Sequence, residues 1–282
     1  MFVGIDFGTS NSSAAVYNGK EIVYIPLDPF NPEDIHVLSS MLYLSRTGER
    51  LVGHKAITEY IEQMAGRIIK LERKAYGDVE MTFGDMTYIA KGFYLDEKNI
   101  PGRLFQYLKK YMGSNFRTNV FGTLYKPYEL VALILKYMKT TTEHYLRQDV
   151  DGVVLGRPVR FADEEAKNRD AARHLRMACQ LAGFKTVEFQ YEPVAAASNY
   201  ALTANDNENI LIFDFGGGTF DVTVVNVQTK KAKVLGLAGV PVGGSDFDKA
   251  IMYDKITPHF GRGCYVDAEH LVHDTLYLDL LN

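Results

Sequence analysis

The sequence predicts an α/β protein built from two related lobes. Short apolar strands alternate with amphipathic helices along most of the chain, a pattern typical of α/β architectures. An Asp-Phe-Gly triplet followed by two further strands occurs at 6–8 and again at 214–216. Chance is the alternative explanation, but the flanking strands repeat together with the triplet. We therefore expect two lobes that each offer an aspartate and a glycine turn to one cleft.

Composition limits the class of protein. The 282 residues are 46% apolar and 23% charged, as in a soluble globular chain long enough for two domains. Lysine and arginine number 31 against 35 acidic residues, so no basic excess points to nucleic acid or an anionic membrane. Two distant cysteines, Cys179 and Cys264, argue against a disulfide framework. With no leader-like start and no apolar stretch of about 20 residues, we expect a cytoplasmic protein without a membrane span.

The first half of the chain is expected to begin with strands and to become more helical. The N-terminal strands are expected over 2–6, 13–17 and 21–25. Asn18-Gly19 joins the last two and is a strong signal for a hairpin turn. The stretch 27–34, rich in Pro, Asp and Asn, is expected to be a loop. Apolar residues at helical spacing predict helices over 54–63, 103–112 and 128–146, with a strand pair over 78–94.

In the second half, strands and helices alternate. The expected strands cover 153–156, 187–191, 210–214, 221–227 and 232–237. The expected helices cover 163–181, 193–202 and the chain from about 245 to its end. Gly183 stands where a helix C-terminal cap is expected. This order favours a sheet whose strands are connected through helices.

Two glycine turns directly follow predicted strands. They are Gly8-Thr9-Ser10-Asn11 and Gly216-Gly217-Gly218-Thr219. Glycine lets the backbone approach a ligand closely or adopt a left-handed conformation, and successive N–H groups can form a nest for phosphate. Three consecutive glycines cost backbone entropy that a purely structural turn rarely requires. We interpret both turns as phosphate-binding loops, with a structural turn as the alternative, above all for the first.

The phosphate site predicted here differs from the common nucleotide motifs. The chain contains neither the Gly-x-x-x-x-Gly-Lys-Ser/Thr sequence of the P-loop nor a Gly-x-Gly-x-x-Gly fingerprint. Without the P-loop lysine, Mg²⁺ is the simplest source of compensating charge. Asp6 and Asp214 stand at strand ends beside the two loops, and we expect them to hold the waters around such an ion. A loop-capping role is the alternative for each aspartate.

Four segments carry a family resemblance, namely 3–12, 192–197, 211–222 and 243–248. Together they resemble the ATPase domain of the seventy-kilodalton, DnaK-type heat-shock chaperones. Their order and spacing agree with the family, so the resemblance covers nearly the whole chain. The segments 102–114 and 156–159 look more similar to a divergent bacterial YegD-like branch.

The resemblance implies an actin/hexokinase-like ATPase fold with a ribonuclease H-like motif, in which two lobes surround a nucleotide cleft. It places the first lobe in 1–190, with an insertion at about 27–115, and the start of an incomplete second lobe in 191–282. The implied ligands are ATP or ADP with Mg²⁺. The implied function is a chaperone-like domain with slow hydrolysis to ADP and phosphate, coupled to lobe closure. Protein clients or co-chaperones would act through regions outside this chain.

The resemblance also assigns site residues position by position. The nucleotide would be bound by Gly8, Thr9, Ser10, Asn11, Gly216, Gly217, Gly218, Thr219, Gly243 and Gly244. Asp6 and Asp214 would hold Mg²⁺ through water. Asp214, Glu192 and Thr219 would take part in catalysis.

One departure from the family concerns the catalytic lysine. We expect it four residues after Gly53, where Ile57 stands, and Lys55 would point about 200° away on a helix. Hydrolysis would then be very slow or absent, unless Lys109 or Lys110 fills the position through space. A non-hydrolysing, nucleotide-dependent scaffold or sensor is therefore the alternative function. A sugar kinase on the same fold is the least supported, because the segment that begins at Glu192 matches the chaperones.

Overall fold

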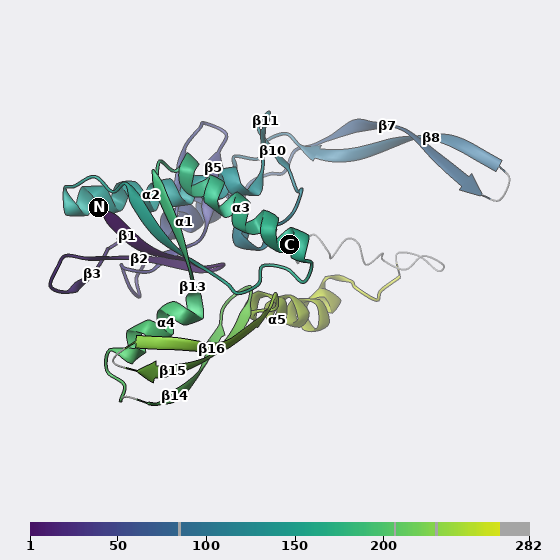
Figure 1. Ribbon diagram of the computed structural model, residues 1–282. Helices are drawn as coiled ribbons and strands as arrows, with labels where there is room; N and C mark the ends of the chain where they lie inside the picture. The colour runs from purple at the N-terminus through teal and green to yellow at the C-terminus, as the bar shows by residue number, and fades with distance from the viewer. Residues whose placement is uncertain (84–85, 206, 229–230, 266–282) are drawn as a thin grey trace.

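The computed structural model describes residues 1–83, 86–205, 207–228 and 231–265. A larger body is built around one mixed sheet, and a smaller three-stranded sheet lies below it in the view of Figure 1. A long two-stranded hairpin projects from the larger body. In these described residues, no helix combines the length and the apolar character needed to cross a membrane.

The first sheet combines strands from the N-terminal part of the chain with two strands that lie between residues 152 and 191. Its order is β13 (Thr186–Tyr191), β12 (Gly152–Arg157), β1 (Phe2–Phe7), β2 (Asn11–Tyr17) and β3 (Ile22–Tyr24), with β4 (Leu38–Ser39) paired to β2. β1 runs parallel to β12 and antiparallel to β2, so the sheet is mixed. Val3, Ile5 and Phe7 are buried on one face of β1, which explains the period-two pattern of the sequence.

Two long helices pack against each other and contribute to the main core. They are α2 (Pro127–Leu146) and α3 (Glu165–Leu181), both close to their expected bounds. Leu130, Ile134 and Met138 recur every fourth residue on α2 and are buried, as helical periodicity requires. Gly183 follows α3 with a φ of 98°, so the expected C-terminal cap is confirmed.

The inserted region contains a three-stranded sheet and the projecting hairpin. The sheet has the order β6 (Arg50–Val52), β5 (Leu42–Ser45) and β9 (Gly102–Phe105), and α1 (His54–Met64) packs against it. β7 (Leu71–Phe83) and β8 (Met86–Glu97) form the hairpin, which confirms the expected strand pair and extends it. A short hairpin of β10 (Thr118–Val120) and β11 (Thr123–Tyr125) follows.

The helix expected over 103–112 is wrong. The first residues of that range belong to β9, and only Leu108–Tyr111 form a 3₁₀ helix, η1. Tyr107 between them has a φ of 56°, which interrupts any continuous α-helix. β9 pairs with β5 along four residues, and a Cβ at Gly102 would overlap the ring of Tyr43. Long-range pairing thus overrides a local spacing that resembles a helix.

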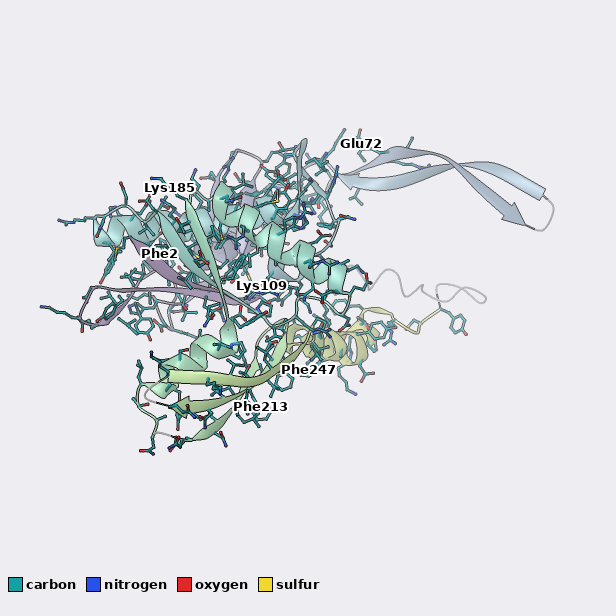
Figure 2. The ribbon with its side chains drawn as sticks, viewed as in Figure 1. Phe2, Glu72, Lys109, Lys185, Phe213 and Phe247 are labelled. Atoms are coloured by element: carbon teal, nitrogen blue, oxygen red, sulfur yellow. The ribbon has the colours of Figure 1, made fainter. Side chains whose placement is uncertain are left out.

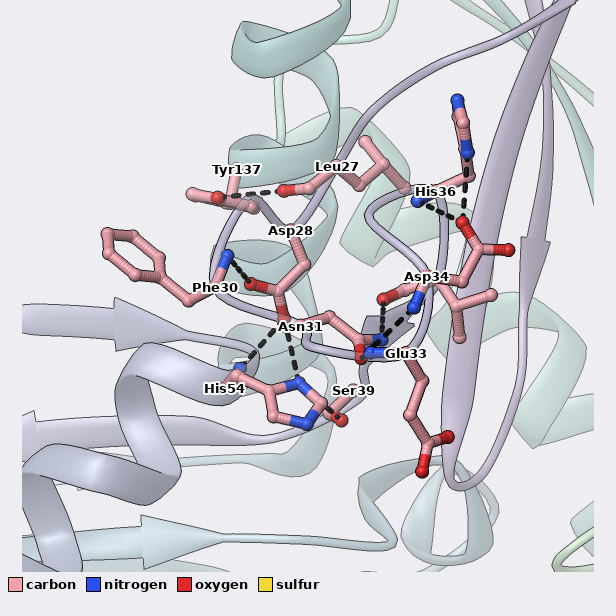
Figure 3. Close-up of polar contacts among 11 residues, drawn as sticks. Leu27, Asp28, Phe30, Asn31, Glu33, Asp34, His36, Ser39, His54 and Tyr137 are labelled. Atoms are coloured by element: carbon pink, nitrogen blue, oxygen red, sulfur yellow. Dashed lines mark hydrogen bonds and ion pairs between the residues drawn. The ribbon is translucent and has the colours of Figure 1, made fainter.

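The loop expected over 27–34 is anchored to two helices by its own polar atoms (Figure 3). The buried Asp28 carboxylate accepts hydrogen bonds from the backbone N–H groups of Phe30 and His54, at 3.2 and 2.8 Å. Tyr137 on α2 donates its hydroxyl to the Leu27 carbonyl at 2.9 Å. His54 is the first residue of α1, so its backbone N–H has no acceptor within the helix. The Asp28 carboxylate supplies that acceptor and places a negative charge at the helix N-terminus.

The second sheet consists of β14 (Asn209–Phe215), β15 (Phe220–Gln228) and β16 (Lys231–Val240), all antiparallel. The helix α4 (Glu192–Ala201) packs against it. The chain then forms α5 (Gly244–Ile251), a π-helical turn (Met252–Ile256) and a 3₁₀ turn (Thr257–Phe260). The helices expected from about 245 to the chain end are therefore present to residue 260. The expectation is wrong for 261–265, which are not helical, and 266–282 lie outside the described residues.

The repeat inferred from the sequence is present in the strand pairing. In the first sheet Phe7, the last residue of β1, pairs with Ser12 five positions later. In the second sheet Phe215, the last residue of β14, pairs with Phe220 five positions later. Both units therefore place an aspartate next to the last residue of a strand that leads into a tight turn, and these two turns form the candidate site.

Candidate functional site

A cavity of about 300 Å³ lies where the two glycine turns meet. Its walls combine the end of β1, the end of β14, the start of α4 and the 3₁₀ turn η1. The lining residues are Asp6, Gly8, Thr9, Ser10, Asn11, Lys109, Glu192, Asp214, Phe215, Gly216, Gly217, Gly218 and Thr219. All of the predicted site residues except Gly243 and Gly244 are thus brought to one cavity.

The two glycine turns approach each other closely. A Cβ at Gly217 would overlap Ser10 Oγ, and one at Gly218 would lie 2.5 Å from Thr9 Oγ1. Neither glycine has a left-handed φ. Of the two reasons for glycine given by the sequence, close approach of the backbone therefore applies here, and a left-handed conformation does not. A Cβ at either position would force the facing hydroxyl to shift, so glycine at both positions permits the close approach of the two turns.

Gly243 and Gly244 lie behind the triple-glycine turn. The backbone N–H groups of Gly244 and Ser245 donate to the carbonyls of Gly216 and Gly217 at 3.0 and 2.9 Å. A Cβ at Gly243 would lie 2.5 Å from Gly218 N and 2.6 Å from Gly216 O. These two glycines therefore support the triple-glycine turn from outside the cavity.

Lys109 supplies a cation to the site. Its side chain is 5% exposed, and its Nζ lies 2.6 Å from Glu192 Oε1. Figure 2 shows Lys109 where the larger body faces the smaller sheet. Of the two lysines that the sequence left as substitutes for the family lysine, Lys109 is the one that lines this cavity. Ile57 lies on α1 and is not among the residues that line the cavity.

Lys110, the next residue of η1, points to a different partner. Its Nζ lies 2.6 Å from Asp246 Oδ1 and 3.2 Å from Ser245 Oγ on α5. Lys109 thus contacts α4, which precedes the second sheet in the sequence, and Lys110 contacts α5, which follows it. The inserted region thus contacts the helices that precede and follow the second sheet through these adjacent lysines.

Two aspartates of the cavity, Asp6 and Asp214, have raised pKa values. Burial raises the pKa of Asp6, and Glu192 and Asp214 raise it further, while Lys109 opposes them. Burial likewise raises the pKa of Asp214, with Glu192 adding to the effect and Lys109 opposing it. Three carboxylates therefore share one lysine, so the cavity carries an excess of negative charge that a bound cation would relieve.

Asp221 is a member of this charged group that the sequence reasoning did not select. It is fully buried on β15, and its Oδ1 accepts a hydrogen bond from the Val159 backbone N–H at 3.2 Å. Its Oδ2 has no hydrogen-bond partner among the described residues. Burial raises the pKa of Asp221 to about 6, and Glu192 and Asp214 raise it as well. An aspartate at a buried strand position, three residues after the last of the glycines, was the available sequence signal.

Ionisation of Asp221 is expected to destabilise the fold without a bound cation. In the folded state the pKa of Asp221 is about 6, above the ordinary 3.8, so folding favours the protonated carboxyl. Its stabilising contribution is fully present below about pH 4 and is lost as pH rises through 6. A shift of about two units corresponds to about 3 kcal/mol at most. Asp221→Asn should therefore gain stability relative to the wild type between pH 4 and 7.5, measured by urea unfolding without nucleotide. A difference that does not vary with pH would contradict the assignment.

The fold and the site together define an α/β protein in which two related glycine turns surround an acidic cavity. A family model described as Hsp70 protein matches residues 2–273, and the chain belongs to the Hsp70 family. Membership implies the actin/hexokinase-like ATPase fold, with which the mixed α/β structure is consistent. ATPase domains of this family bind ATP or ADP with Mg²⁺, so a nucleotide-binding, chaperone-like function is indicated.

Proposed function

We propose that this chain is a Mg²⁺-dependent ATP-binding domain that slowly hydrolyses ATP to ADP and phosphate. The observation that carries the proposal is the buried Lys109–Glu192 pair, at 2.6 Å, in a cavity walled by two glycine turns. A cation there can stabilise charge that develops on a transferring phosphoryl group. This favours hydrolysis over the non-hydrolysing scaffold or sensor, which depended on a missing lysine.

The two glycine turns would hold the phosphate chain. Their backbone N–H groups lie at the ends of β1 and β14, and Thr9, Ser10 and Thr219 add hydroxyl donors at the same cavity. In-line phosphoryl transfer depends mainly on positioning and charge stabilisation, so no covalent nucleophile is required. Gly243 and Gly244 would act by keeping the second turn in place.

The acidic residues fit a bound Mg²⁺. Asp6 and Asp214 border the cavity, and their raised pKa values reflect crowding of negative charge that a divalent ion would remove. Both would hold the ion through its waters, and Mg²⁺ commonly keeps several waters in phosphate sites. The ion would supply charge neutralisation to the phosphates. Glu192 and Asp214 would accept hydrogen bonds from the attacking water, and Lys109 would keep Glu192 oriented.

The nucleotide state would be coupled to the relative position of two lobes, 1–190 and 191–282. Support comes from the lysines of η1, because Lys109 contacts Glu192 and Lys110 contacts Asp246, both beyond residue 190. A ligand that alters these ion pairs would alter the contact between the lobes. We further propose that the chain belongs to the YegD-like branch and that clients or co-chaperones contact other regions.

The proposal is tested by single-turnover ATP hydrolysis beside ATP affinity, with and without Mg²⁺. We expect tight binding only with Mg²⁺, followed by slow release of ADP and phosphate. Binding without any turnover would instead support the scaffold or sensor. Absence of Mg²⁺-dependent binding would contradict the proposed function as a whole.

Asp214→Asn is expected to weaken Mg²⁺-dependent ATP binding or turnover while leaving the fold intact. The change removes one of the three carboxylates that create the excess negative charge, and it keeps the side-chain size. We expect a loss of about tenfold or more in one of the two quantities. Calorimetry with Mg·ATP and a single-turnover assay measure them, and unchanged values of both would contradict the role of Asp214.

A further inference from the structure

A separate cavity of about 640 Å³ lies at the base of the projecting hairpin. Its walls come from the turn after β5, the first residues of β7, the last residue of β8, β9 and the turn between β10 and β11. It shares none of its lining residues with the cavity between the glycine turns. Its size is in the range of pockets that bind small organic molecules.

The cavity is basic although the chain carries a formal charge of -4. Arg46, Lys74 and Arg103 line it, and Glu97 is its acidic member. The Glu97 carboxylate is paired with Arg67, and this hydrogen bond raises the pKa of the Arg67 guanidinium. Glu97 is therefore already neutralised by a residue outside the lining, and the guanidiniums of Arg46 and Arg103 give the described lining of the cavity a net positive charge.

The two guanidinium groups are held in place without carboxylate partners. Arg103 NH1 donates to Thr118 Oγ1 and to the Asn119 carbonyl at 2.9 and 2.8 Å. Arg46 Nε donates to the Ile100 carbonyl at 3.1 Å, and its guanidinium lies 4.9 Å from the centre of the Phe121 ring. Among the described residues neither arginine forms an ion pair. Each guanidinium has five N–H donors, so each keeps donors for a ligand.

We propose that this cavity is a second ligand site that binds a small organic anion carrying a phosphate monoester or two carboxylates. A planar guanidinium matches carboxylate and phosphate oxygens in a bidentate manner, and two anchored guanidiniums favour a ligand with at least two negative charges. Contact of the two guanidiniums with the rings of Phe121 and Phe105, at 4.9 and 5.4 Å from the ring centres, orders both side chains before binding. The site is independent of nucleotide binding in the cleft.

The test is a titration followed through the arginine Nε signals of the full chain, with phenyl phosphate in one arm and succinate in the other. The cavity between the glycine turns contains no arginine among its described lining residues. Shifts of the arginine signals therefore report binding at the second cavity, even if the proposed function fails. We expect saturable shifts of Arg46 and Arg103 with a Kd of about 1 mM or lower at low ionic strength. The arm that saturates identifies the anion, and shifts in neither arm would overturn the proposal.

Variants test whether the guanidiniums are the ligands. Arg46→Gln and Arg103→Gln should each weaken binding by about tenfold. Arg50→Gln is the matched control, because Arg50 is exposed on the neighbouring strand β6 and does not line the cavity. It should bind like the wild type. An equal loss in Arg50→Gln would show non-specific attraction and overturn the proposal.

Asn119→Asp keeps the test valid if Arg103→Gln fails to fold. Asn119 Oδ1 accepts a hydrogen bond from the Gly122 backbone N–H at 2.8 Å, and an aspartate retains that acceptor. The variant adds a negative charge to the lining of the cavity. We expect unchanged thermal stability and about tenfold weaker anion binding. Wild-type affinity in Asn119→Asp would contradict a site at this position.

Discussion

Replacing Lys109 by methionine is expected to lower single-turnover ATP hydrolysis by about 100-fold or more, while ATP affinity falls by less than about tenfold. Lys109 Nζ lies 2.6 Å from Glu192 Oε1 and opposes the negative charge that Asp6 and Asp214 share. Methionine keeps an unbranched stem of similar length and removes the ammonium group, with its charge and its hydrogen bond to Glu192. A cation that acts mainly on the transition state alters the rate more than ground-state binding.

Lys110→Met and Ile57→Lys are the controls for this experiment. Lys110 is adjacent in sequence but pairs with Asp246, so its loss should alter the rate much less than the loss of Lys109. Ile57→Lys should leave the rate unchanged, because residue 57 does not line the cavity and Lys109 already supplies the cation. A faster Ile57→Lys variant, or an unaffected Lys109→Met variant, would show that the catalytic lysine position is not that of Lys109.

Gly243→Ala is expected to destabilise the chain by about 1–3 kcal/mol and to weaken ATP binding by about tenfold or more. A single Cβ at this position would lie 2.5 Å from Gly218 N, 2.6 Å from Gly216 O and 2.6 Å from Gly217 C. All three are backbone atoms, which cannot rotate away as a side chain can. The triple-glycine turn must therefore move, and the N–H groups that would bind phosphate move with it.

Gly244→Ala is the matched control for Gly243→Ala. A Cβ at Gly244 would lie no nearer than 3.9 Å to its neighbours, which is ordinary van der Waals distance. The residue is the first of α5, where alanine is a good helix former. Urea unfolding and Mg·ATP calorimetry should give wild-type values for this variant. Equal losses in the two variants would show that close approach is not the reason for glycine at 243.

Local sequence patterns predicted the elements that depend on local interactions. The alternation in β1, the apolar stripe of α2 and the cap at Gly183 are each determined within a few residues, and the structure has them near the expected bounds. The helix expected over 103–112 failed because β9 is stabilised by pairing with β5, which is distant in the sequence. Periodicity within ten residues contains no information about such a partner.

The sequence by itself determined the α/β class, the repeated strand-and-turn units and the two glycine turns with their aspartates. Each of these follows from residue type, short-range spacing and the repetition of a motif. Only the tertiary structure decided which lysine enters the site, since Lys109 and Glu192 are 83 positions apart. It also decided that Asp221 is buried with an unpaired oxygen and that Gly243 supports the turn from behind. Charge coupling and close approach depend on distances in space, which the linear order of residues does not specify.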